Sequence, residues 1–114
     1  MHFTREMSDG IWIERVNLER ATLKEADKFK NILQHDIEQG CKSMIVDLSK
    51  CEFIDSTFLG AIVACLKKIT TAGGDMKLIG FKPAVHDMFN LTRMFRVFET
   101  FPSVDQAVAS FKDS

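Results

Sequence analysis

The chain has 114 residues, 46% of them apolar, and its 15 basic residues nearly balance its 16 acidic ones. This length and composition are typical of one α/β domain, residues 1–114, with a core that needs no disulfide or metal, and they exclude a disordered chain. The net charge of −1 is spread along the chain and forms no basic patch, so we expect no nucleic-acid partner.

The cysteines and the N-terminal residues indicate the compartment. Cys41, Cys51 and Cys65 are odd in number and show no CxxC spacing, which favours reduced core cysteines over a disulfide framework or a metal site. The opening "MHFTREMSDG" lacks a signal-peptide pattern, and no stretch reaches the roughly 18 apolar residues of a membrane span. We therefore expect a cytoplasmic protein without a membrane span.

The first third of the chain predicts two strands and a helix. Apolar residues alternate with polar ones over residues 10–16, "GIWIERV", which is typical of a partly buried strand, and the turn before it predicts a short strand within residues 2–7. Thr22 and Glu25 have the spacing of a capping box, and Gly40 can end a helix. We predict a helix over residues 23–38.

Strands and helices alternate over the rest of the chain. Short apolar runs predict strands at 43–49 and 76–80. Apolar residues at helical spacing predict a helix over 57–71, and residues 97–101 should form a short extended segment. Pro83 starts a further helix that should carry Val85, Met88, Phe89 and Leu91 toward the core. Ser103 and Gln106 cap a last helix. This alternation predicts a mixed, mostly parallel sheet.

Three polar residues, Asp55, Ser56 and Thr57, stand where the apolar approach "CEFI" turns into a helix. Asp55 is well placed to cap that helix, and capping alone would explain the motif. Catalysis would need a base for Ser56, and neither a GxSxG elbow nor a Walker motif is present. The sequence therefore predicts no enzyme, and it gives no sign of a cofactor.

The order of motifs from "MIVDLS" through "IDSTFLG", the Gly-Gly stop and the closing "FPSVDQAVASF" resembles the STAS domain, the sulfate transporter and anti-sigma factor antagonist family. The resemblance covers the last two-thirds of the chain and is strongest to free-standing anti-sigma factor antagonists. It implies one STAS-like domain in which a central sheet of four to five strands packs with about four helices.

The resemblance also implies a function for the serine after the aspartate, which is Ser56. In the family, this serine is phosphorylated by the anti-sigma factor, a serine kinase with a histidine-kinase-like ATPase fold. The unphosphorylated antagonist binds that kinase and frees a sigma factor, and a metal-dependent serine phosphatase resets the switch. Asp55 would orient the loop and help engage the kinase, and Thr57 would be a neighbouring contact.

Three departures from the family pattern bear on partner binding. Phe58 stands where the family usually has glycine, and it either packs against its own domain or forms an apolar anchor for the partner. Glu19 stands nearest the position of a family aspartate whose loop lies beside the phosphorylation site. Arg93 also replaces a glycine, and we expect it in a left-handed conformation.

Two alternative functions stay open at this point. The chain could be a scaffold or a transporter-associated STAS subunit, for example of a lipid-transport complex, in which the serine is never phosphorylated. It could instead be a small-ligand or nucleotide-binding module, which would require a concave pocket near the Ser56 loop. Fold alone does not decide between these functions, and the sequence does not indicate the oligomeric state.

Overall fold

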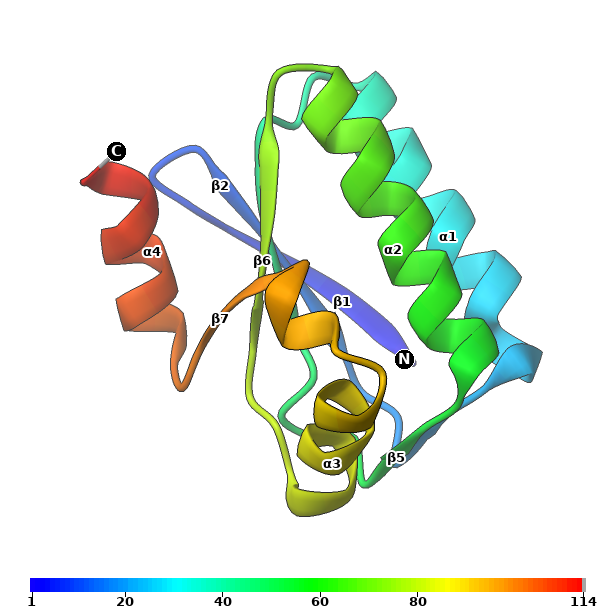
Figure 1. The fold of residues 1–114 in the computed structure, drawn as a ribbon. Helices are drawn as coiled ribbons and strands as arrows, with labels where there is room; N and C mark the ends of the chain where they lie inside the picture. The colour runs from blue at the N-terminus through cyan, green and yellow to red at the C-terminus, as the bar shows by residue number, and fades with distance from the viewer. Residues whose placement is uncertain (114) are drawn as a thin grey trace.

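The computed structural model describes residues 1–113, which form an α/β domain around a five-stranded sheet (Figure 1). The strand order is β1-β2-β4-β6-β7. The outer pair β1 and β2 is antiparallel and the remaining pairs are parallel, which confirms the predicted mixed, mostly parallel sheet. The strands are β1 (Phe3–Ser8), β2 (Ile11–Val16), β4 (Ser43–Asp47), β6 (Asp75–Ile79) and β7 (Glu99–Phe101).

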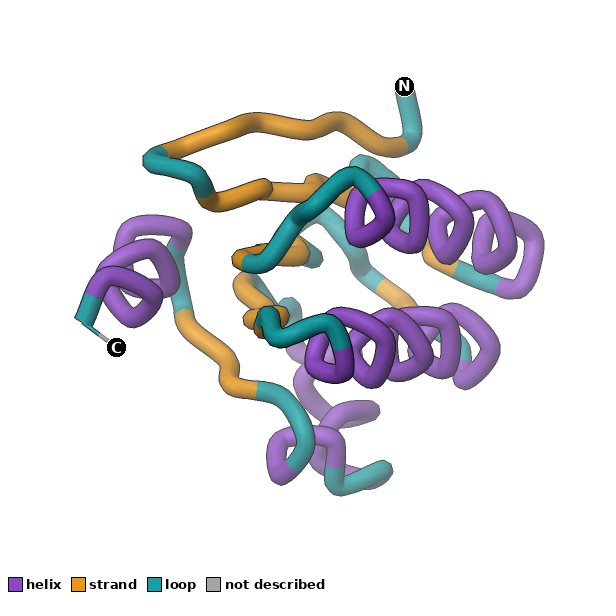
Figure 2. Tube along the Cα trace, turned by 90° about the horizontal axis from the view of Figure 1, so that it is seen from above, coloured by secondary structure: helices purple, strands orange, loops and turns teal. Residues whose placement is uncertain are grey.

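Helices cover both faces of this sheet, because parallel neighbours require crossover connections. Two long helices, α1 (Leu23–Glu38) and α2 (Ser56–Thr71), lie side by side on one face. A short helix, α4 (Val104–Lys112), packs on the opposite face, as the view from above shows (Figure 2). None of the helices within residues 1–113 is long and apolar enough to cross a membrane.

The remaining elements gather at one end of the sheet. Helix α3 (Pro83–Leu91) and the 3₁₀ turn η1 (Met94–Arg96) lie there, beside a second sheet of two short parallel strands. These strands are β3 (Arg20–Ala21) and β5 (Phe53–Ile54). The sequence did not predict them as a pair, because two residues are too few to show a periodic pattern.

Local signals placed most element boundaries within a residue or two. The capping box at Thr22 and Glu25 is present, and α1 spans the predicted residues. Arg93 has a φ of 59°, which confirms the expected left-handed conformation. The expectation that Leu91 faces the core is wrong, since its side chain is 85% exposed. Leu91 follows the buried Phe89 by two residues, about 200° around the helix, so it points the other way.

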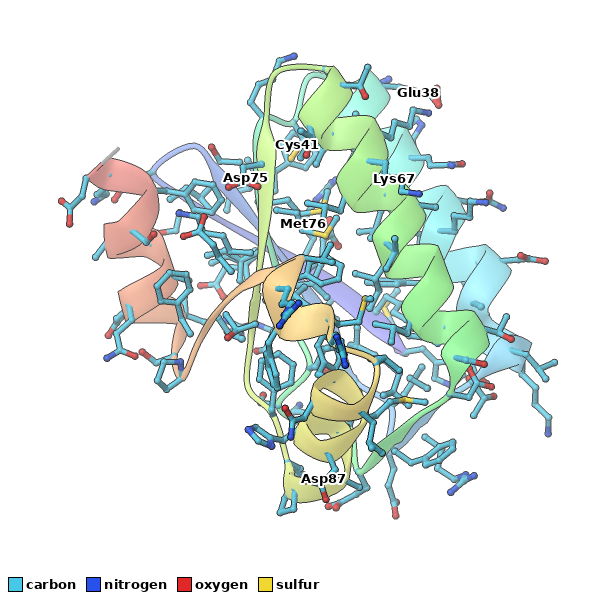
Figure 3. All side chains as sticks on the ribbon, viewed as in Figure 1. Glu38, Cys41, Lys67, Asp75, Met76 and Asp87 are labelled. Carbon is cyan, nitrogen blue, oxygen red and sulfur yellow. The ribbon has the colours of Figure 1, made fainter. Side chains whose placement is uncertain are left out.

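The interior between the sheet and the helices is apolar. Figure 3 shows Met76 on the inner side of β6, whereas Lys67 and Glu38 project from the outer sides of α2 and α1. All three cysteines are buried and unpaired, as predicted. Burial raises the pKa of Cys41 and Cys51 to about 12 and that of Cys65 to about 11, so these thiols stay protonated and unreactive.

Glu14, an ionisable residue, is buried although the alternating sequence pattern placed it on the polar side of its strand. Glu14 of β2 is only 2% exposed, because α1 and β1 cover that face of the strand. Asp36 of α1 is also 2% exposed, and Arg5 of β1 donates a hydrogen bond of 2.9 Å to it. Burial, followed by the nearby Asp36, raises the pKa of Glu14 to about 9, so Glu14 holds a proton at neutral pH.

We predict that Glu14→Gln flattens the pH dependence of stability. Between pH 4.5 and about pH 9, folded Glu14 holds a proton that the unfolded chain has lost. The free energy of unfolding of the wild type therefore falls as pH rises through this window. The amide of glutamine stays neutral and can donate to Asp36, so the variant should melt at the higher temperature above pH 7, by a margin that grows toward pH 9.

Thermal unfolding at pH 5, 7 and 9 measures this margin. Glu6→Gln is a matched control, because Glu6 lies in β1 with a 58% exposed side chain and pairs with Arg15. Its melting temperature should differ from that of the wild type by the same amount at pH 7 and pH 9. A margin for Glu14→Gln that does not change with pH would contradict the assignment.

Candidate functional site

The two-stranded sheet brings the N-termini of α1 and α2 together. Strand β3 leads into α1 and strand β5 leads into α2, and the two strands are parallel, so both helices begin at the same end. The carbonyl oxygen of Glu19 accepts hydrogen bonds from the amides of Glu52 and Phe53, at 2.7 and 3.1 Å, and the amide of Asp55 donates to the carbonyl of Ala21 at 3.1 Å. The loop that carries Glu19 therefore lies beside the approach to Ser56.

The carboxylate of Asp55 caps both helices. Its Oδ1 accepts a hydrogen bond of 2.8 Å from the amide of Phe58 in α2, which agrees with the predicted cap. Its Oδ2 accepts a second bond of 2.8 Å from the amide of Leu23, the first residue of α1. The first amides of a helix have no acceptor within the helix and form its positive end. One negative group thus binds one amide at each of two helix N-termini, in addition to the Thr22 cap of α1.

Ser56 and Thr57 are the first two residues of α2, and both are exposed. The Ser56 hydroxyl makes no hydrogen bond with any described residue, and in particular none with His2, His35 or His86. The site therefore presents a free hydroxyl beside a carboxylate whose own hydrogen bonds are made within the protein. Within residues 1–113, no group of three or more His, Cys, Asp or Glu side chains could hold a metal ion.

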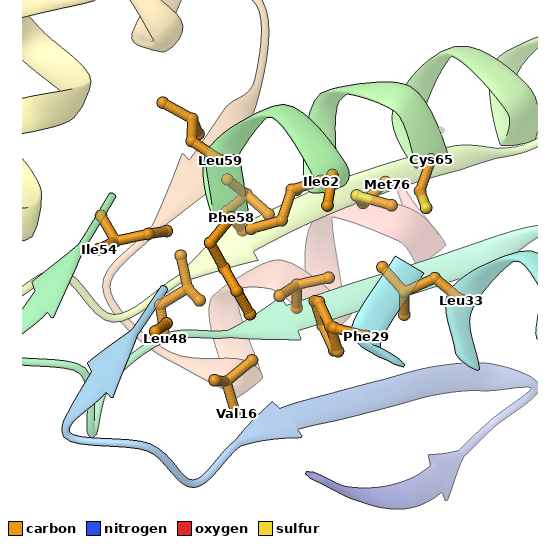
Figure 4. Close-up of a cluster of buried hydrophobic side chains, with 14 of the residues drawn as sticks. Val16, Phe29, Leu33, Leu48, Ile54, Phe58, Leu59, Ile62, Cys65 and Met76 are labelled. Atoms are coloured by element: carbon orange, nitrogen blue, oxygen red, sulfur yellow. The ribbon is translucent and has the colours of Figure 1, made fainter. Parts of the chain in front are cut away.

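Phe58 lies behind this surface and does not form part of it. Its side chain has no exposed area and stacks on Phe29 of α1, with ring centroids 5.2 Å apart (Figure 4). Phe29 in turn stacks on Phe3 of β1, at 4.8 Å. Of the two alternatives for Phe58, packing against its own domain describes the structure. This corrects its assignment as a partner-binding residue, because a fully buried side chain has no surface to offer.

Sequence reasoning missed Leu23. Its amide is one of the two that bind Asp55, and its side chain is 67% exposed in the first turn of α1. The available signal was its position directly after the cap Thr22, outside the buried stripe that Ala26 and Phe29 begin. Glu19 is exposed on its loop, as its proposed role requires.

We predict that Asp55→Ala lowers the free energy of unfolding by about 1–3 kcal/mol, because it leaves two helix amides without their acceptor. Asp55→Asn keeps one carbonyl acceptor and should lose less. Urea unfolding of both variants measures the loss. Asp105→Ala in the first turn of α4, where Ser103 is the cap, is a control that removes an acidic residue but no cap. An Asp55→Ala variant as stable as the wild type would refute the shared cap.

The position of Phe58 leads to a second prediction. Phe58→Ala should cost about 3–5 kcal/mol of unfolding free energy, as removal of a buried aromatic side chain does. Phe53→Ala, five residues earlier and only partly buried, should cost clearly less. Equilibrium unfolding of the two variants gives the comparison. Equal and small losses would mean that Phe58 is not held in the core.

Comparison with known proteins agrees with this geometry. The family model of the STAS domain matches residues 14–107. The protein BtrV of Bordetella bronchiseptica, named as a candidate anti-sigma factor antagonist, is 26% identical over 98% of this chain and 96% of its own length. The crystal structure of a candidate anti-sigma factor antagonist from Thermotoga maritima has 25% identity and a TM-score of 0.86, covering 95% of this chain and 92% of that one.

More distant structures share the fold alone. The unphosphorylated form of the anti-sigma factor antagonist SpoIIAA has 16% identity and a TM-score of 0.83, covering 98% of this chain and 97% of that one. Bacillus SpoIIAA also has a structure in its phosphorylated form, with a TM-score of 0.73, 15% identity, and coverage of 96% of this chain and 98% of that one. Because the family model spans well over half of its residues, the chain belongs to the STAS domain family.

Proposed function

We propose that this protein is an anti-sigma factor antagonist, a protein-interaction switch controlled by phosphorylation of Ser56. The observation that carries the proposal is the free, exposed hydroxyl of Ser56 at the first position of α2, beside the carboxylate that caps two helices. The names of its relatives and its membership of the STAS family support the same function. The chain would be a substrate of enzymes and not itself an enzyme.

Phosphorylation at this position should leave the fold intact. A phosphoryl group adds about −1.5 to −2 charges and three acceptor oxygens. At the start of α2 these oxygens meet the positive end of the helix, and Asp55 occupies only the amide of Phe58 among the first three amides. Ser56 is exposed, so the group displaces no packed side chain.

The same phosphoryl group should abolish binding to a partner. In an interface it adds bulk and a charge that must lose its water, next to the carboxylate of Asp55. The surface involved would comprise Asp55, Ser56 and Thr57, together with Glu19, whose loop is hydrogen-bonded to β5. Phe58 would support this surface from the core.

The partners follow from the proposed role. The unphosphorylated protein would bind an anti-sigma factor kinase of the histidine-kinase-like ATPase fold and thereby release a sigma factor. A metal-dependent serine phosphatase would restore the unphosphorylated form. The binding of the kinase and the removal of the phosphoryl group would both take place in the cytoplasm.

The test measures both the phosphorylation of Ser56 and the binding of a kinase. Peptide mass spectrometry of the protein from growing, starved and stressed native cells should place a phosphoryl group on Ser56, and Ser56→Ala should lose it. Immobilised wild type and Ser56→Ala should capture an ATPase-type kinase from lysate. Ser56→Glu should bind that kinase at least about tenfold more weakly, through the added charge.

Two controls separate this switch from a constitutive scaffold. Ser49→Ala changes another exposed serine, outside the junction, and should leave modification and capture unchanged. Melting temperatures of all variants should match that of the wild type, so that a change in binding does not reflect unfolding. If Ser56 is unmodified in every condition and Ser56→Glu captures the same partners as the wild type, the protein is a scaffold and the proposal fails.

A further inference from the structure

An arginine stacked on an aromatic ring lies on the outer side of the two-stranded sheet that leads into α1 and α2. The guanidinium carbon of Arg20, in β3, is 4.3 Å from the centre of the Phe53 ring, in β5. The strand register places Arg20 opposite Phe53, and Ala21 opposite Ile54. Ala21 and Ile54 are buried, so the alternation of side chains along a strand turns Arg20 and Phe53 outward. The proposed function uses neither of these two side chains.

The guanidinium of Arg20 has no acidic partner within residues 1–113. Arg20 is exposed, and its side chain forms neither a hydrogen bond nor an ion pair with a described residue. Of the acidic residues nearest along the chain, Glu52 pairs with Lys82 at 2.7 Å, and Asp55 accepts its two amide bonds. Glu19 is exposed, and its carboxylate also lacks an ion pair in the described part of the chain. The N–H donors at the edge of the guanidinium are therefore open to a group from another molecule.

Stacking holds the Arg20 side chain in place. Phe53 is partly buried, and its amide donates to the carbonyl of Glu19, so the ring is a fixed base for the guanidinium. A guanidinium held in advance loses less conformational entropy when it binds. It can bind a carboxylate through two parallel N–H···O bonds, and arginine and aromatic residues are enriched among the residues that dominate interfaces. The pair thus favours an acidic side chain of a partner protein.

The pair lies close to the serine that the proposed function uses. Phe53 precedes Ser56 by three residues, which span no more than about 11 Å. A partner that covers Ser56 with an interface of ordinary size, about 800 Å² on each side, would also cover Arg20. Asp55 and Glu19 lie on the same surface, so the partner must place its acidic group at Arg20 and keep it away from these two carboxylates.

We infer that Arg20, held on Phe53, determines partner specificity by binding the carboxylate of an aspartate or glutamate side chain on the anti-sigma factor kinase. This inference rests on the proposed function, because it concerns the surface around Ser56. It also gives phosphorylation a specific effect. A phosphoryl group on Ser56 adds about −1.5 to −2 charges close to Arg20, where it repels the acidic group of the partner.

Dissociation constants of the kinase that the wild type captures test this inference. The purified kinase should bind Arg20→Ala at least about tenfold more weakly than the wild type, through loss of a charged contact. Arg20→Lys keeps the charge but lacks the planar fork, and it should lose at least about threefold. Raising the salt from about 50 to about 300 mM should weaken wild-type binding more than it weakens Arg20→Ala binding.

Lys67→Ala is the matched control. Lys67 is an exposed cation near the other end of α2, projects outward in Figure 3, and forms no ion pair with a described residue. Its removal takes away the same charge, but affinity and salt dependence should match those of the wild type. Melting temperatures of all variants should lie within a few degrees of the wild type. Arg20→Lys retains the charge and an aliphatic stem, so the test holds even if Arg20→Ala alters the fold.

The result distinguishes failure of this inference from failure of the proposed function. A wild type that captures no ATPase-type kinase would contradict both. If the kinase binds the wild type and both Arg20 variants equally, the proposed function stands and the role of Arg20 is refuted. Weaker binding of Arg20→Ala with the salt dependence of the wild type would mean that only the aliphatic stem makes contact, and it would overturn the assignment of a carboxylate.

Discussion

The two hydrogen bonds of the Asp55 carboxylate join the N-termini of α1 and α2, and the arrangement of the junction depends on them. Without this carboxylate, the amides of Leu23 and Phe58, one at each positive helix end, would have no acceptor. The carboxylate offsets both and fixes α2 so that its first residue, Ser56, faces solvent. The pairing of β3 with β5 holds the two chain segments in register for this contact.

The aromatic stack beneath the junction gives it a rigid base. Phe3, Phe29 and Phe58 link β1, α1 and α2 in one column of rings. Phe58, at a position where the family usually has glycine, packs its large side chain into the core, so the outer surface stays polar. A modification at Ser56 would therefore alter the charge and shape that a partner meets, while the packing below stays as it is.

The sequence predicted what depends on local chemistry. The capping box at Thr22, the cap at Asp55 and the left-handed Arg93 all follow from residue types at short spacing. Contacts between distant segments could not be predicted in this way. The bond from Leu23 to Asp55 spans 32 residues, and it depends on a sheet too short to leave a periodic pattern.

Local patterns also failed to predict which side chains are buried. Phe58 had two open alternatives, because its environment depends on Phe29 of another helix. Glu14 was assigned to the polar side of a strand, yet α1 and β1 enclose it. Resemblance to the STAS family supplied the role proposed for Ser56, which a short Asp-Ser-Thr motif before a helix would not have indicated.

The central claim is that a charge at Ser56 changes the surface and not the fold. Its most direct test is a comparison of ¹H–¹⁵N spectra and melting temperatures of the protein with and without a phosphoryl group on Ser56. We predict shifts confined to residues 19–23 and 52–60, with a melting temperature within a few degrees of that of the unmodified protein. Shifts throughout the core, or a large loss of stability, would contradict the account.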